Sequence, residues 1–125
     1  MTSEEKKILY KDLSARQPYR PFVCFAGKVT MPFLDVIAST EGNELMSING
    51  LSLEDVKPYL RPMSSMTEEE SKEFAMLQTD FYSDGWLYPI AAVNMVDWFI
   101  ARHFDFRGLI PMGLALEAPA DMYKF

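Results

Sequence analysis

The order of apolar and polar residues predicts strands in the first half of the chain. Residues 22–39, "FVCFAGKVTMPFLDVIAS", are rich in β-branched and aromatic side chains, and "AGK" can turn the chain. We expect two strands here, at about 21–26 and 29–38, with Pro32 placing the second at a sheet edge or a bulge. "LMSI" at 45–48 predicts a short third strand, and "VKPYLRP" at 56–62 predicts an extended segment that can form a fourth.

The N-terminal residues and the second half follow a helical period instead. "TSEEKKILYKDLSAR" at 2–16 begins with a capping box of Thr2 and Glu5, and Leu9 and Leu13 form one narrow apolar face. "SSMTEEESKEFAMLQ" at 64–78 carries a second capping box and an apolar stripe at helical spacing. "TDFYSDGW" at 79–86 is expected to be a loop.

The segment "PIAAVNMVDWFIARHF" at 89–104 has the strongest helical pattern. Its apolar residues, Val96 among them, cover nearly the whole circumference, which indicates burial on most sides. We expect the helix of about 89–104 to be the central helix of the fold, or else part of a dimer interface. The tail that follows should make one short turn and then extend, packed by Leu109, Leu114 and Leu116.

Together these segments predict one α+β domain over residues 1–125. The length fits a single domain, and 49% apolar residues are enough for a core. The first half should form a small, bent antiparallel sheet on which the helices pack. An SH3-type barrel is one closed form that such a sheet can take.

Charge and cysteine content narrow the classes of function. The net charge is −6 and the basic residues are scattered, so we expect neither nucleic acid nor an anionic membrane as a partner. The single cysteine, Cys24, lies in an apolar run and should be a buried, inert side chain. No signal core and no membrane-spanning window stands out, which favours the cytoplasm.

The segment "RHFDFRGL", residues 102–109, holds the only histidine of the chain. One interpretation makes His103 a general base oriented by Asp105, with Arg107 beside them, in a small-ligand or enzyme site. The interpretation that we prefer is structural: Arg102 and His103 complement the carbonyl end of a buried helix, and Asp105 pairs with Arg107 or caps the next turn.

The segment "DFYSDGWLYP" is the best candidate for a binding surface. Tyr82, Trp86 and Tyr88 lie close together in a predicted loop, and aromatic side chains are enriched at protein interfaces. The alternative is that these rings fill the space between sheet and helices.

The chain contains no sequence motif that is typical of a metal, phosphate-binding or catalytic site. One His and one Cys far apart make no metal site, and the glutamates near residue 70 are spaced as a solvated helix face. There is no Gly-rich phosphate loop and no Gly-x-Ser-x-Gly elbow, so we expect no cofactor, no metal and no catalytic residue.

Three segments of the chain resemble those of a known family: "KDLSARQPY", "VKPYLRPMSSMTEEE" and "HFDFRGLIPMGLALEAPADMY". They are similar to a family of small uncharacterised proteins encoded by gut anaerobic bacteria, their phages and mobile elements. This chain departs from the family pattern at Ser14, where a cysteine is often seen, and at Arg102, where a second histidine is often seen. The resemblance implies an origin and no activity.

The leading hypothesis is a non-enzymatic interaction protein of phage or mobile-element origin that binds a protein partner through Tyr82, Trp86 and Tyr88. A small-ligand binder or enzyme centred on His103, Asp105 and Arg107 is one alternative. An acidic mimic that occupies the nucleic-acid site of a host defence protein is another.

Overall fold

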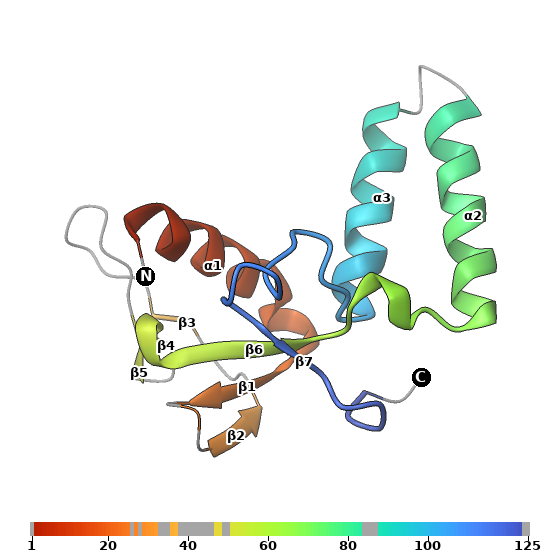
Figure 1. The fold of residues 1–125 in the computed structure, drawn as a ribbon. Helices are drawn as coiled ribbons and strands as arrows, with labels where there is room; N and C mark the ends of the chain where they lie inside the picture. Colours follow the sequence, from red (N-terminus) through yellow and green to blue (C-terminus); the bar gives the residue numbers. More distant parts are fainter. Residues whose placement is uncertain are drawn as a thin grey trace.

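The computed structural model of the chain has an α+β fold, as predicted (Figure 1). It describes residues 2–25, 27, 29–32, 36–37, 47–48, 51–83 and 88–123.

Helix α1, Ser3–Arg16, begins at the predicted capping box. The Glu5 amide donates to the Thr2 hydroxyl over 3.0 Å, and the Thr2 amide donates to the Glu5 carboxylate over 2.8 Å. The helix buries Leu9 and Leu13, as the stripe predicted, and ends in a single turn of 3-10 helix, η1 at Gln17–Tyr19, because Pro18 cannot continue it.

The main sheet has the order β2-β1-β6-β7. Its strands are β1 at Phe22–Phe25, β2 at Val29–Pro32, β6 at Val56–Leu60 and β7 at Leu116–Glu117. Pro32 does lie on an edge strand, where its missing amide costs no ladder bond. The strands from the first half pair antiparallel, as predicted, and the tail adds β7 beside β6 in parallel. The closed SH3-type form stays a prediction.

A second, three-stranded sheet is formed by very short strands: β3 at Val36–Ile37, β4 at Ser47–Ile48 and β5 at Leu51–Ser52. The strand predicted over 29–38 is therefore divided between two sheets, with β2 pairing β1 and β3 pairing β4. A 3-10 turn, η2 at Leu53–Asp55, leads from β5 into β6.

The core lies between α1, the main sheet and the chain after the last helix. Buried side chains of all three pack together: Leu9, Leu13, Val23, Val56, Leu60, Leu109, Leu114 and Ala115. The tail is packed by Leu109 and Leu114 as predicted, whereas Leu116 is only half-buried. Helix α1 is thus the helix that covers the sheet (Figure 1).

The remaining helices form an antiparallel pair that stands away from the sheet (Figure 1). A 3-10 turn, η3 at Met63–Ser65, leads from β6 into α2 at Glu68–Ser83, and α3 follows at Tyr88–Ala101. We call α2 and α3 the hairpin, and the rest of the described chain the body. The loop predicted at 79–86 was wrong in its first part, because α2 continues to Ser83.

The prediction that α3 is the central, buried helix was also wrong. Its buried residues are Ala91, Phe99 and Ile100, whereas Ile90 is 60% exposed, Val93 is 58% exposed and Val96 is 36% exposed. A helix that is apolar all round can bury only the faces that have neighbours. Here α2 covers one face, the body covers the C-terminal end, and the outer face has no cover among the described residues. No helix in the described part of the chain is long and apolar enough to cross a membrane.

Candidate functional site

His103 ends α3 through its backbone. It adopts the left-handed conformation, with φ of 62°, which is uncommon for a residue other than glycine. The His103 amide donates to the Ile100 carbonyl over 3.1 Å, and the Phe104 amide donates to the Phe99 carbonyl over 2.9 Å. These two bonds form a Schellman motif, and the contact of the Phe104 and Phe99 rings, 6.5 Å apart, is the apolar contact that accompanies it.

The His103 side chain is buried beside Tyr123. Their rings stack with centroids 3.9 Å apart, and the Tyr123 hydroxyl donates to the Tyr59 carbonyl over 2.9 Å. Burial lowers the pKa of His103 to about 4, and the positive charges of Arg16 and Arg61 lower it further in the same direction. The imidazole is therefore neutral at pH 7 and does not supply the charge that we expected it to offer the helix dipole. Burial also raises the pKa of Tyr123 to about 12.

Asp105 caps the turn that follows the helix. Its two carboxylate oxygens accept from the amides of Leu109 and Ile110, over 2.8 Å and 2.9 Å. Of the two roles predicted for Asp105, capping is confirmed. The pairing with Arg107 was wrong, because Arg107 Nε donates instead to Asp12 Oδ1 over 3.0 Å.

His103, Asp105 and Arg107 each make a different contact. The histidine stacks on Tyr123, the aspartate binds backbone amides, and the arginine lies on α1. Each of the three side chains holds the segment after α3 in place.

Sequence reasoning missed the acid that organises this region, Asp12. Asp12 and Arg16 are fully buried, and Arg16 Nε donates to Asp12 Oδ2 over 2.7 Å. Arg16 also donates to the Phe104 carbonyl over 2.7 Å, so the pair ties α1 to the end of the hairpin. The available signal was the i, i+4 spacing of an acid and an arginine on the same helical face as Leu9 and Leu13.

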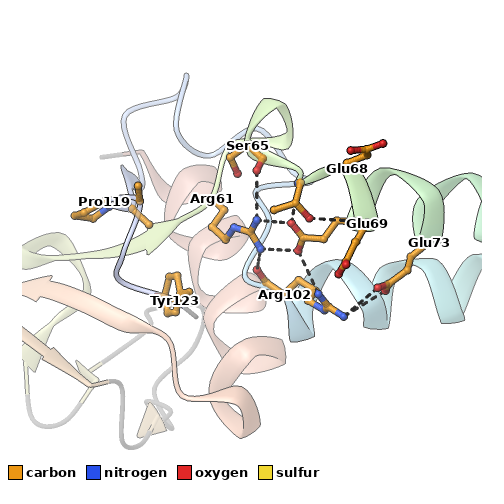
Figure 2. Close-up of a pocket in the computed structure, with 12 residues that line it drawn as sticks. Arg61, Ser65, Glu68, Glu69, Glu73, Arg102, Pro119 and Tyr123 are labelled. Atoms are coloured by element: carbon orange, nitrogen blue, oxygen red, sulfur yellow. Dashed lines mark hydrogen bonds and ion pairs between the residues drawn. The ribbon is translucent and has the colours of Figure 1, made fainter. Parts of the chain in front are cut away.

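A pocket of about 640 Å³ opens where the hairpin meets the body (Figure 2). Figure 2 shows Arg61 and Arg102 between the α2 glutamates on one side and Pro119 and Tyr123 on the other. The remaining lining comes from η3, the start of α2 and the tail: Ser65, Thr67, Glu68, Glu69, Glu70, Glu73, Ala118 and Ala120.

The centre of this pocket is a network of ion pairs on Glu70. Arg61 binds it with two parallel hydrogen bonds of 2.6 Å and 2.8 Å, and Arg102 approaches it at 3.3 Å. The Glu70 carboxylate also accepts from the Thr67 amide over 3.0 Å, and Thr67 accepts from the Glu70 amide over 3.2 Å, as the second capping box predicted. The bonds from Arg61 lower the pKa of Glu70 to about 2.

Arg102 extends the network to Glu73, whose carboxylate also accepts from Trp98 Nε1 over 2.9 Å. The network thus joins β6, the start of α2 and the end of α3. Its charges are compensated among themselves, and none of the residues that line the pocket is a histidine or a cysteine. We conclude that the arrangement fixes the base of the hairpin.

The outer surface of the hairpin exposes apolar side chains, in contrast to the charged pocket at its base. It presents Ile90 and Val93 on α3, and α2 presents Met76, which is 71% exposed. Trp86 and the side chains of Tyr82 and Tyr88 lie outside the described residues.

Two further predictions concern Cys24 and a metal site. Cys24 is buried in β1 and is not in a disulfide, as predicted. Within the described residues, no three His, Cys, Asp or Glu side chains gather in a way that would hold a metal ion.

No protein-family model, no curated protein and no solved structure matches the chain. Its function must therefore be inferred from its own geometry.

Proposed function

We propose that the chain is a non-enzymatic interaction protein that binds a protein partner through the hairpin. The observation that carries the proposal is the exposure of Ile90 and Val93 on the outer face of α3. Exposed apolar side chains that gather on one element mark interaction sites in soluble proteins, whereas single ones do not.

The construction of the hairpin supports this role. Phe74 of α2 packs against Trp98 and Phe99 of α3, stacked on the first and tilted against the second, with ring centroids 5.9 Å and 5.4 Å apart, so the helices hold each other. The ion pairs on Glu70 fix the base. A rigid element that presents an apolar face loses little conformational entropy when it binds.

The aromatic segment fits the same proposal. The backbone of Tyr82 lies in the last turn of α2, and Tyr88 begins α3. Tyr88 is only two residues from Ile90 in the sequence, and we propose that Tyr82, Trp86 and Tyr88 take part in the same binding. We further propose, from the resemblance in sequence, an origin in a phage or mobile element and a place in the bacterial cytoplasm.

The enzyme hypothesis finds less support in the geometry. His103, Asp105 and Arg107 each serve a separate structural contact, and the pKa of His103, at about 4, is far from that of a general base at neutral pH. The hypothesis of a nucleic-acid mimic keeps one supporting observation, the acidic character of the hairpin, and it predicts that nucleic acid competes with the chain for its partner.

The proposal is tested by capture from a lysate of a gut anaerobic bacterium. The immobilised chain is compared with Val93→Ser and with Val29→Ser, and bound proteins are identified by mass spectrometry. Val29 is a matched control, because it is 46% exposed on β2, in the body. Thermal unfolding of each variant confirms that it is folded.

We expect a protein that the parent and Val29→Ser both capture and that Val93→Ser does not. The same protein, purified, should bind the chain directly. A partner that all three proteins capture equally would show that the binding surface lies elsewhere and would overturn the proposal.

A further inference from the structure

The net charge of the sequence falls in the segment that contains the hairpin. Residues 68–101 contain seven acids and one lysine, whereas the rest of the chain contains eleven acids and eleven bases. Residues 68–101 therefore carry the whole excess of −6, and the rest of the sequence sums to zero.

Part of this charge is compensated at the base. Glu70 pairs with Arg61 and Arg102, and Glu73 pairs with Arg102. Lys72 lies 4.0 Å from Glu68. Glu69 and Asp97 are exposed on the two helices, and Asp80 and Asp84 are the other acids of this segment of the sequence.

Asp97 lies directly beside the apolar face of α3. It is exposed and stands four residues after Val93, and residues at that spacing are neighbours on a helix surface. Asn94 holds the same relation to Ile90 and is also exposed. A partner that covers Ile90 and Val93 must therefore also meet the carboxylate of Asp97.

The apolar side chains and the neighbouring carboxylate of Asp97 favour one of two possible partners for this face of α3. A second copy would bring another hairpin of the same sign, and each close pair of like charges costs up to about 1 kcal/mol even in water. A surface with lysine or arginine beside an apolar groove gains from the same charges, and complementary potentials also speed association.

We propose that the outer face of α3 docks on a basic protein surface, with Ile90 and Val93 in an apolar groove and Asp97 against a lysine or arginine. This inference rests on the proposed function and adds the chemistry of the partner.

The probe is a helical peptide of about 18 residues with leucine on one face and lysine on the other, labelled for fluorescence anisotropy. A second peptide replaces every lysine with glutamine. Both are titrated with the full chain and with four variants: Val93→Ser, Asp97→Lys, Val29→Ser and Asp121→Lys. The last two are matched controls in the body, because Val29 and Asp121 are exposed there.

The lysine peptide should bind the parent, and the glutamine peptide should not. Asp97→Lys should weaken binding about ten-fold, because it replaces an attraction with a repulsion. Val93→Ser should weaken it as well, and both controls should stay within about two-fold of the parent.

Other outcomes overturn the inference. Equal weakening by Asp97→Lys and Asp121→Lys would mean attraction to net charge alone, and no binding of the lysine peptide would mean that the face does not take a basic helix. A dimer in light scattering that Val93→Ser dissociates would make a second copy the occupant. If instead the captured partner is lost with Val93→Ser but is insensitive to Asp97→Lys, the proposed function stands and only the basic partner is excluded.

Discussion

His103 contributes to the end of α3 through both its backbone and its ring. Its backbone takes a left-handed conformation, and its ring fills the space against Tyr123. Burial keeps the ring neutral, so protonation must oppose folding.

The first prediction follows from the lowered pKa of His103. The pKa of His103 is about 4 in the folded chain and about 6.5 in the unfolded chain, so between these values the unfolded state binds more protons. The free energy of unfolding should be highest above pH 6.5 and fall by up to about 3 kcal/mol as the pH drops to 4. Denaturant unfolding at a series of pH values measures it.

His103→Asn is the control for this pH dependence, because asparagine tolerates the left-handed conformation and does not titrate. The chain has no other histidine, so the variant should lose most of the slope between pH 4.5 and 6.5. An unchanged slope would show that His103 is not the titrating group. Glu70 acts in a lower window: the stability that comes from its lowered pKa is lost as the pH falls from 4.5 toward 2.

The second prediction concerns Asp12. Asp12→Ala leaves Arg16 buried without its carboxylate, which should cost about 3–5 kcal/mol of stability. The double variant Asp12→Ala with Arg16→Met removes both charges and should be more stable than Asp12→Ala alone. Chemical denaturation of the three proteins measures the difference, and a double variant less stable than the single one would contradict a coupled pair.

A third prediction concerns the thiol of Cys24. Because the side chain is buried in β1, a thiol reagent should label it slowly in the native chain and quickly after denaturation. Equal rates in both states would place Cys24 in contact with solvent.

At the scale of elements, α3 has one face that folds the protein and one that does not. Phe99 is buried and stacks on Phe106, with centroids 5.6 Å apart, whereas Val93 is exposed. Phe99→Asp should cost several kcal/mol, because it buries a carboxylate in an aromatic cluster. Val93→Asp should change the stability by no more than about 0.5 kcal/mol. Thermal unfolding compares the two, and a large loss with Val93→Asp would mean that the outer face is covered.

Local signals in the sequence predicted the elements that depend on local contacts. The two capping boxes placed the starts of α1 and α2, and Pro32 placed an edge strand. Elements whose form depends on distant parts of the chain were missed. The parallel strand β7 exists only because the tail returns beside β6, and nothing in the two residues Leu116 and Glu117 indicates that neighbour.

The apolar pattern of α3 led to a wrong prediction of burial, and the reason is physical. An apolar pattern indicates which faces of a helix favour burial. It does not indicate whether the residues that bury a face belong to the same chain. Of the candidate residues, the sequence indicated those at the end of α3, whereas binding by the aromatic segment stays a prediction. The sequence could not indicate that Asp12 would meet Arg107, 95 residues away, because that pairing depends on the packing of α1 against the tail.

At the scale of the whole molecule, we propose that folding and binding belong to different parts. The body holds the core, and the acidic hairpin holds an apolar face that the described chain leaves uncovered. The network on Glu70 joins the two parts. On this proposal, changes on the outer face of the hairpin should alter binding while the fold persists.

The most direct test of this account is the dissociation constant of the captured partner, measured by calorimetry for the parent, Val93→Ser and Val29→Ser. Loss of the buried contact should weaken Val93→Ser by about ten-fold or more, with Val29→Ser within about two-fold of the parent. All three proteins should share one melting temperature within a few degrees. Equal affinities for the three would contradict the account, because the outer face of α3 would then take no part in binding.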